Sequence, residues 1–482
     1  MPSLPITPPR RFLPLPSTHP STCGTSSALP PAARRSTVRR LLLLGLFTLV
    51  ALTLFLLAPA SFSLPDSLSP SSWTPSALFD AAPVSPPTPA PFCSARDFSS
   101  GRWVPKSPSL TPNTSVVDVL SASGFSGVTQ EDFKPHWFLG SKEGDWRNME
   151  EYRWRAAQWD WEAGSEVCGE QVRRVEAEEL VRELVHGGGW MLLGDSLSEQ
   201  HFFSLGCTLF PHVEVRWGAG WWEQLMFLRA DSPLLDSLDL PPSFSLSSTP
   251  LITNLRTDHG YTKPELLLLF LSTPAAASTP RKKILTDYPV NSPPIDEYLS
   301  RFFSVGEYTD SPERYSTLIF STGAHFTPRE FAFPRGQPAI QDFFGAVVAN
   351  WTATAREYLE REDGQGADEG DGTRRQILVR AASSGHDECH EAVSPFEDEW
   401  PRPKSYNWAV IPEMNAMFES EIDRAAHPRL NFLPLDRLSQ LRPDGHSSDC
   451  LHIAVGTGIF EGWTDYLAYF VRPKARDREE GK

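Results

Sequence analysis

The sequence lacks an excess of positive charge. Its 44 Lys and Arg residues are outnumbered by 60 Asp and Glu residues, which gives the 482-residue chain a formal net charge of −16. Because such a protein would repel the phosphates of nucleic acid, we expect no nucleic-acid partner. The sequence also lacks a phosphate-binding glycine loop, the glycine fingerprint of dinucleotide-binding proteins and any signature of acetyl-coenzyme A binding. Neutral glycans and small esters remain compatible with this composition.

Long hydrophobic runs are scarce. One charge-free run, Leu41–Ala58, would span about 27 Å as a helix, which matches a thin bilayer core. A second run, Glu265–Ser272, is too short to cross a membrane and suits a buried strand or helix.

Acidic residues are absent from residues 1–40, which are rich in Pro, Ser and Thr. This segment contains the arginines Arg10, Arg11, Arg34, Arg35, Arg39 and Arg40. Because these positive charges precede the apolar run, the positive-inside rule predicts a single-pass type II membrane protein with a cytoplasmic N-terminus. A cleaved signal peptide is the alternative, although the run is long for one and begins far from the N-terminus.

Apolar periodicity is missing from residues 59–92, where Pro, Ser and Ala dominate. This composition cannot bury a core and favours an extended stem that holds a domain away from the membrane. The sequence therefore predicts a cytoplasmic tail at 1–40, a signal-anchor helix at 41–58, a stem at 59–92, a lumenal globular domain at 93–472 and a charged tail at 473–482.

Cysteine is scarce as well, with six residues in the chain. Cys23 belongs to the predicted cytoplasmic tail, and the lumenal cysteines are Cys93, Cys168, Cys207, Cys389 and Cys450. Since the lumen is oxidising, we expect two disulfides and one spare thiol. Acceptor sequences for N-glycosylation at Asn113 and Asn350 lie on the same side. These features predict a Golgi or other secretory-pathway membrane.

Helical and strand-like patterns alternate from residue 170 onward. Helices are expected at Gln171–Val185, from about Leu197 to Phe210, at Ile340–Tyr358, around Ile411–Ala425 and at the C-terminal end of the domain; strands are expected at 190–193, Ser316–Gly323, Gln376–Ser384 and Asn431–Asp436. This alternation predicts an α/β fold with a mainly parallel sheet covered by helices on both faces. Residues 211–310, rich in Pro, Ser and Trp, show no clear pattern and are interpreted as an insertion.

The stretch Gly188–Phe202 places Gly194-Asp195-Ser196 between an apolar strand and a helix-compatible segment. Two interpretations compete. Ser196 is the N-cap of an ordinary helix, or it is a nucleophile at the carboxyl edge of a parallel sheet, where α/β folds place their sites. The three residues alone do not decide between them.

Near the C-terminus, Asp449 and His452 are three residues apart. On a tight turn this spacing lets the carboxylate accept a hydrogen bond from the imidazole, fix its tautomer and stabilise the imidazolium that forms when the histidine acts as a base. The alternative is a polar surface loop. His446, in the preceding Asp-Gly-His, is assigned a turn-stabilising role.

The run Gly385–Glu391 brings together residue types that ligate metals, namely His386, Asp387, Cys389 and His390. Zinc sites normally need further ligands at defined spacing, and a disulfide competes for Cys389. We therefore expect no metal site.

Four segments resemble, in order, the blocks of a known family. They are CSARDFSSGRWV (Cys93–Val104), YRWRAAQWDWEAGSEVC (Tyr152–Cys168), LLGDSLSEQHFFSLGC (Leu192–Cys207) and RPDGHSSDCLH (Arg442–His452) with Trp463. The family is the PC-esterase family of the SGNH/GDSL hydrolase superfamily, which includes the trichome-birefringence-like polysaccharide O-acetyltransferases. The segments span nearly all of residues 93–471.

The resemblance implies an SGNH-like three-layer α/β/α sandwich and a catalytic triad. Ser196 would be the nucleophile, His452 the base and then the acid, and Asp449 the residue that orients His452. The backbone N–H of Ser196 would help to form the oxyanion hole, for which the further candidates are Asn254, Arg256 and Gly323. The family block that often reads Asn-Thr-Gly-His-Trp-Trp is STGAHF here (Ser321–Phe326).

The resemblance also implies two disulfides, Cys93–Cys168 and Cys389–Cys450, with Cys207 outside any disulfide. It implies an O-acetyltransferase without a bound cofactor that moves acetyl groups to the hydroxyls of a glycan acceptor. The donor would be acetyl-coenzyme A or another acyl carrier as co-substrate, or the acetyl group would come from a separate membrane protein. One rival is a carbohydrate acetyl esterase, in which water accepts the acyl group. Another is a catalytically inactive glycan-binding membrane protein.

Overall fold

The computed structural model describes residues 92–125, 127–128, 154–218, 222–242, 244–273, 285–286, 290, 292–304, 314–364, 375–447 and 449–472. All of them belong to one compact unit, Ser85–Lys482. The predicted cytoplasmic tail, the run Leu41–Ala58, nearly all of the predicted stem and the charged tail at 473–482 lie outside the described residues.

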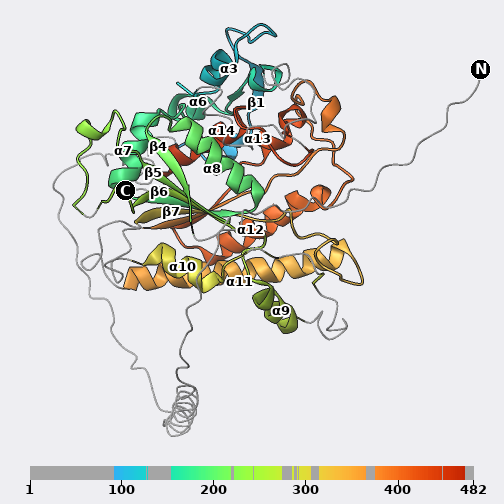
Figure 1. Ribbon diagram of the computed structural model, residues 1–482. Coiled ribbons are helices and arrows are strands. Elements are labelled where there is room, and N and C mark those ends of the chain that lie inside the picture. Colours follow the sequence, from blue (N-terminus) through green and yellow to red (C-terminus); the bar gives the residue numbers. More distant parts are fainter. Residues whose placement is uncertain are drawn as a thin grey trace, which may run out of the picture. The chain divides into compact units, whose positions relative to one another are not determined.

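A seven-stranded sheet forms the centre of this unit (Figure 1). Its strands lie in the order β4 (Val213–Trp217), β5 (Glu223–Leu228), β6 (Pro250–Arg256), β3 (Gly189–Gly194), β7 (Tyr315–Ser321), β8 (Gln376–Arg380) and β9 (Leu430–Leu433). The neighbours from β6 to β9 are parallel, whereas β5 is antiparallel to β6 and β4 is antiparallel to β5. After β3 the chain builds β6 on one side of it and later β7 on the other. The carboxyl end of β3 is therefore a topological switch point, where open α/β sheets place ligand sites.

Helices cover both faces of the sheet because the central strands are apolar on both sides. In β3, Trp190 and Leu192 pack into one core cluster and Met191 and Leu193 into another. The first cluster includes residues of α7 (Ala177–Gly187), α8 (Ser196–Thr208), α13 (Arg437–Gln440) and α14 (Ile459–Val471). The second includes residues of α9 (Lys263–Ser272), α10 (Ile295–Phe303), α11 (Gln337–Gly364) and α12 (Ile411–Ala425). Figure 1 shows these two helical layers above and below the sheet.

The N-terminal part of the unit packs on the first helical layer. It contains α2 (Ala95–Ser99), α3 (Val116–Ala122), α6 (Glu166–Gln171) and the antiparallel pair β1 (Arg102–Pro105) and β2 (Trp159–Glu162). The indole N–H of Trp103 donates to the carbonyl of Leu438 at 3.0 Å. A disulfide between Cys93 and Cys168 joins the start of this segment to α6.

The predicted fold class is corrected on two points. The sheet is mixed, because β4 is antiparallel to β5 and β5 is antiparallel to β6, whereas the pairs from β6 to β9 are parallel. The five residues 218–222 between β4 and β5 are too few for the crossover of a dozen or more residues that a parallel pair needs. The prediction also placed a transmembrane helix before the domain. No helix in the described part of the chain is both long and apolar enough to cross a membrane, and the run Leu41–Ala58 lies outside that part.

The interpretation of residues 211–310 as an insertion is wrong. This region supplies β4, β5 and β6, and β6 pairs directly with the central strand β3. Its strands are short and stand between loops rich in Pro and Ser, so that their apolar residues give a weak periodic signal.

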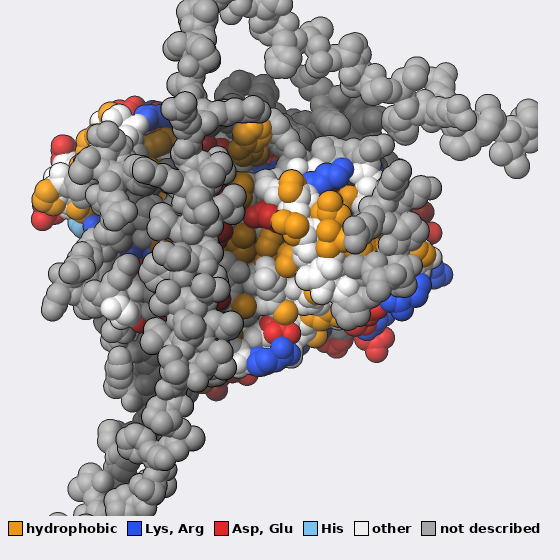
Figure 2. Space-filling view, turned by 90° about the horizontal axis from the view of Figure 1, so that it is seen from below, with side chains coloured by type: hydrophobic (Ala, Val, Ile, Leu, Met, Phe, Trp, Pro, Cys, Tyr) orange, Lys and Arg blue, Asp and Glu red, His pale blue; other side chains and the backbone are white. Residues whose placement is uncertain are grey.

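The run Glu265–Ser272 forms most of α9 and is only half buried. Leu266 and Phe270 face the core, whereas Leu267, Leu268 and Leu271 are exposed. Hydrophobic side chains gather on the face of this helical layer seen from below in Figure 2.

Candidate active site

Ser196 begins helix α8 directly after strand β3. The side chain of Asp195 accepts a hydrogen bond from the Leu197 N–H at 2.9 Å, so Asp195 is the N-cap and Ser196 is not. A Cβ atom at Gly194 would lie 2.2 Å from Ser198 Oγ and 2.6 Å from the Ser321 carbonyl oxygen, and only glycine fits this corner. The turn thus leaves the Ser196 hydroxyl available for another partner at the carboxyl end of β3.

That partner is His452, from the loop before α14. The Oγ of Ser196 lies 2.8 Å from Nε2 of His452, and Nδ1 of His452 lies 2.8 Å from Oδ2 of Asp449. The other carboxylate oxygen of Asp449 accepts from the N–H groups of Leu451 at 2.9 Å and His452 at 2.7 Å. The structure therefore brings together the three residues that the sequence placed in a triad, in the order serine, histidine, carboxylate.

The electrostatics of Asp449 fix the tautomer of His452. Partial burial raises the pKa of the Asp449 carboxyl, but hydrogen bonds from the His452 ring and from the backbone hold this pKa well below its usual range. The ionised carboxylate can only accept, so Nδ1 of His452 carries a proton. Nε2 of the neutral ring then presents its lone pair to the Ser196 hydroxyl, as a general base requires.

Hydrogen bonds from neighbouring residues hold the backbone around His452. Its carbonyl accepts from the Ser447 N–H at 2.7 Å and lies 3.2 Å from Nδ1 of the buried His446. The Cys450 carbonyl accepts from the His386 N–H at 2.8 Å. His446 is therefore a support of the turn.

The four residues considered as metal ligands do not all converge on one point. Nδ1 of His386 lies 2.7 Å from Nε2 of His446, and Asp387 accepts from the backbone N–H of Lys404 and the hydroxyl of Ser405. Cys389 forms a disulfide with Cys450.

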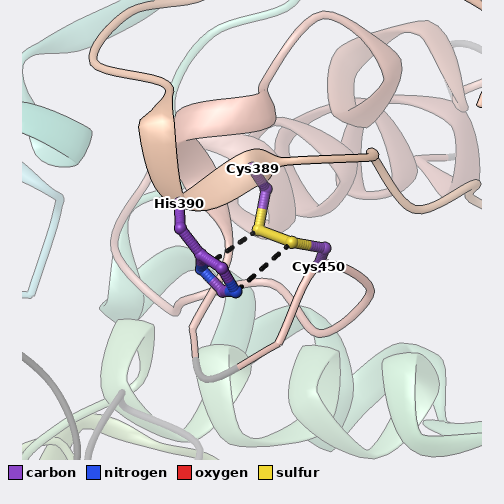
Figure 3. A group of neighbouring side chains, drawn as sticks. All are labelled: Cys389, His390 and Cys450. Carbon is purple, nitrogen blue, oxygen red and sulfur yellow. Dashed lines mark hydrogen bonds between the residues drawn. A yellow bond between two sulfur atoms is a disulfide. The ribbon is translucent and has the colours of Figure 1, made fainter. Parts of the chain in front are cut away.

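His390 lies against this disulfide, with its Nδ1 3.5 Å from Cys389 Sγ and its Nε2 3.7 Å from Cys450 Sγ (Figure 3). The three groups lie close enough to hold an ion. While the sulfurs are bonded to each other, they are not available as thiolate ligands.

Gly323 is the oxyanion candidate whose backbone amide remains available. It follows β7, whose Ser321 is paired with Gly194 next to the nucleophile. The Gly323 carbonyl accepts from the side-chain amide of Asn407 at 2.8 Å, whereas its N–H donates to no acceptor in the described part of the chain. The N–H of Ser196, in the first turn of α8, has no intrahelical acceptor either. These two donors lie on adjacent strand ends.

The side chains of the other two oxyanion candidates, Asn254 and Arg256, are bonded to neighbouring side chains. Nδ2 of the fully buried Asn254 donates to Gln224 Oε1 at 2.5 Å, and Nε2 of Gln224 donates to Glu199 Oε1 at 3.0 Å. Arg256 lies 3.1 Å from Glu199 and 3.2 Å from Asp258 through separate nitrogens. Both oxyanion candidates thus belong to a polar network that supports the first turn of α8.

The network continues through residues that sequence reasoning missed. Nε2 of His325 lies 3.5 Å from Asp258 Oδ1, and its Nδ1 lies 2.7 Å from Glu330 Oε1. Burial lowers the pKa of His325, but the carboxylates of Glu330 and Asp258 outweigh it and raise this pKa overall. Burial raises the pKa of Glu199, against the effect of Arg256. The sequence did contain one signal for these residues. Asp258 and His325 closely follow the two strands that flank β3.

The disulfides are the two pairs that the resemblance implied, Cys93–Cys168 and Cys389–Cys450, and Cys207 is buried and in neither. Of the sequons, Asn113 lies exposed in a turn before α3. Asn350 lies on α11, exposed, with its Oδ1 accepting from the Tyr261 hydroxyl at 2.9 Å.

Comparisons with known proteins add no family assignment. No family model matches this chain, and no curated protein matches it.

Proposed function

We propose that this protein is a polysaccharide O-acetyltransferase that works through an acyl-serine intermediate. The observation that carries the proposal is the hydrogen-bonded series Ser196, His452 and Asp449 at the carboxyl end of β3. A nucleophile, a base and a group that orients the base stand within reach of one another at the switch point of the sheet.

In the first half of the reaction, Ser196 Oγ attacks the carbonyl carbon of the acetyl donor while Nε2 of His452 takes the hydroxyl proton. The negative charge that develops on the carbonyl oxygen is stabilised by N–H donors at the start of α8 and at Gly323. The bond to the leaving group then breaks, and His452 returns the proton to that group. Asp449 stabilises the imidazolium in between.

In the second half, a sugar hydroxyl gives its proton to Nε2 of His452 and attacks the acetyl-serine. The Ser196 oxygen leaves and takes the proton back, so the enzyme is regenerated and an acetyl ester is formed on the glycan. No cofactor is required by these steps. The donor is acetyl-coenzyme A or another acyl carrier, or an acetyl group supplied by a separate membrane protein.

The choice of a glycan acceptor has several supports. The four sequence segments that resemble the PC-esterase family include both parts of the proposed triad. The net charge of −16 suits a neutral acceptor better than a polyanion. Two disulfides fit an oxidising compartment of the secretory pathway, such as the Golgi, where glycans are built.

A carbohydrate acetyl esterase is the second candidate, and one observation favours it. The side chains of Asp449 and His452 are 54% and 27% exposed, so that water can reach the base beside an acyl-serine. Water would then replace the sugar in the second half of the reaction. An inactive glycan-binding protein has less support, because binding alone requires no hydrogen-bonded Ser-His-Asp series.

The test uses purified full-length protein with labelled acetyl donors and neutral oligosaccharides, and then with acetylated oligosaccharides. Transfer of label to the sugar, with acetylated Ser196 trapped by peptide mass spectrometry, supports the transferase. Release of acetate alone supports the esterase. Turnover at the wild-type rate by the Ser196→Ala variant would overturn both.

A further inference from the structure

Most of the aromatic side chains that the structure describes are packed in the interior. Three are strongly exposed: Trp217 at 55%, Trp222 at 43% and Tyr406 at 68%. Covering an exposed aromatic ring with an apolar surface lowers the free energy of the system. Exposed Trp and Tyr residues near a reactive site are therefore candidates for ligand contacts.

Trp217 ends β4 and Trp222 directly precedes β5, so both lie at the edge of the sheet where β6 and β3 end, which is the edge of Ser196. The carbonyl of Trp222 accepts from the N–H of Arg256 at 2.8 Å, and Arg256 is paired with Gly194 across the parallel strands. Neighbouring strands lie about 4.8 Å apart, which puts the backbone of Trp222 about 10 Å from the end of β3. Trp217 is paired with Gln224 and lies one strand further out.

Tyr406 lies on the opposite flank of the site. The next residue, Asn407, donates from its side chain to the carbonyls of Gly323 and Phe326, in the loop that follows β7. Asp387 fixes the preceding residues through Lys404 and Ser405. The backbone of Tyr406 has a φ of +51°, a left-handed conformation that non-glycine residues adopt only at a cost. The ring packs on one side against Trp408, with ring centroids 5.1 Å apart, and is otherwise exposed. A costly conformation that holds a bulky ring in this position points to a role for that ring.

We propose that Trp217, Trp222 and Tyr406 are stacking platforms for a neutral oligosaccharide that crosses the carboxyl edge of the sheet past Ser196. The inference rests on the proposed function and assigns the acceptor its binding residues. A pyranose ring has an apolar face of C–H groups and a rim of hydroxyls, so it covers an aromatic ring while its hydroxyls stay hydrated. Platforms on both flanks hold a chain of sugars across the nucleophile.

The arrangement of charge and apolar surface favours this ligand over others. On the side of Trp217 and Trp222, the neighbouring cations are paired with carboxylates, because Arg216 forms an ion pair with Glu214 and Arg256 forms one with Glu199. An acidic polymer would thus meet no excess of positive charge on that side. A membrane or a partner protein would require one contiguous apolar patch. The three rings do not form one, because strand ends separate them.

Binding is measured in the Ser196→Ala background by calorimetry with mannohexaose, xylohexaose, cellohexaose and maltohexaose. We expect at least one hexaose to bind. Trp217→Ala, Trp222→Ala and Tyr406→Ala should each weaken its binding about tenfold, which is about 1.4 kcal/mol. Trp217→Phe and Tyr406→Phe, which keep an aromatic ring, should recover most of the affinity.

Leu268→Ala is the matched control, because Leu268 is 67% exposed and lies on helix α9 in the other helical layer. It should bind the hexaose as tightly as its parent. Equal affinity of all platform variants and their parent would overturn the inference, and so would the absence of binding to every hexaose. Loss of binding to phosphatidylcholine vesicles in the platform variants, without hexaose binding, would show a membrane contact and overturn it too. The binding assay does not depend on turnover. Failure of the proposed function is seen separately, as wild-type protein that releases no acetate and acetylates no sugar.

Discussion

Nε2 of His452 lies 2.8 Å from Oγ of Ser196, although 256 residues separate them in the chain. Each residue is held by its own set of contacts. Ser196 is set by the turn at Gly194 and by the Asp195 cap, and His452 is set by Asp449 and by the disulfide at Cys450. The sheet then brings these two rigid pieces together at the carboxyl end of β3.

The first prediction concerns the nucleophile. Ser196→Ala removes the attacking oxygen and keeps the helix, because Asp195 provides the cap. We expect acyl transfer to fall by at least about 10³-fold with an unchanged melting temperature. Ser198→Ala, two residues further on and also buried, should keep full activity. Initial rates with an aryl acetate ester check both, and near wild-type turnover by Ser196→Ala would contradict the mechanism.

The second prediction joins the Cys389–Cys450 disulfide to catalysis. Cys450 lies between Asp449 and His452, and the bond anchors their turn across a sequence separation of 61 residues. Loop closure of this length contributes about 4 kcal/mol to stability in the chain-entropy model. The larger effect should be local, since a displacement of His452 by about 1 Å can cost a hundredfold in rate.

Cys389→Ser and Cys450→Ser should therefore each lose most activity, and the double variant should be hardly worse than either. Non-reducing peptide mapping verifies the bond. Detection of Cys450 as an alkylated thiol in active protein would refute this account.

The third prediction concerns Arg256. Its guanidinium lies between Glu199 and Asp258, whose side chains are 6% and 1% exposed. Arg256→Gln removes the cation that these two buried carboxylates share, and breaking a buried ion pair typically costs about 3–5 kcal/mol. We expect such a loss in urea unfolding, together with lower kcat from a loosened first turn of α8. Arg256→Gln combined with Glu199→Gln should recover part of the stability, and strictly additive effects of the two substitutions would rule out the coupling.

Local patterns predicted much of the fold. Helix α12 has the predicted bounds, Ile411–Ala425, and helix α8 runs from Ser196 to Thr208 where Leu197 to Phe210 was expected. Long segments with regular apolar spacing leave little choice of structure. The strands β4 to β6 were missed, because their burial depends on neighbours that are distant in sequence.

The candidate site likewise has one part that a local pattern predicted and one part that it did not. The contact between Asp449 and His452 is made within one turn, so a spacing of three residues was enough to suggest it. The series from Glu199 through Arg256 and Asp258 to His325 joins four separate segments, and no local spacing reveals it. Position after a β-strand was the one available signal.

The fourth prediction assigns the glycosylated asparagine. Asn113 lies exposed in a turn, whereas Asn350 lies on helix α11 with its side chain bonded to Tyr261. We expect Asn113→Gln to abolish most of the mobility shift seen after glycosidase treatment of protein made in a secretory host. Asn350→Gln should leave that shift nearly unchanged. The reverse pattern would show that Asn350 is modified before α11 forms.

The last prediction is a pH dependence of stability. Burial, together with the neighbouring His386, lowers the pKa of His446 to about 3. The unfolded chain binds a proton at His446 below a pH of about 6.5, whereas the folded protein does not until the pH approaches 3. Because the unfolded state binds more protons in this window, stability is fully present above a pH of about 6.5 and is lost as the pH falls.

For His446 alone the loss between pH 7 and pH 5 is at most about 2 kcal/mol. Urea unfolding at a series of pH values measures it. His446→Gln removes one of the histidines that titrate in this range and should reduce the slope, even if it lowers stability at pH 7 through the loss of support for His452. His186→Gln, at the exposed end of α7, is the surface control. A slope in His446→Gln as steep as that of the wild type would show that His446 is already protonated in the folded protein, and that the turn behind His452 carries a buried charge.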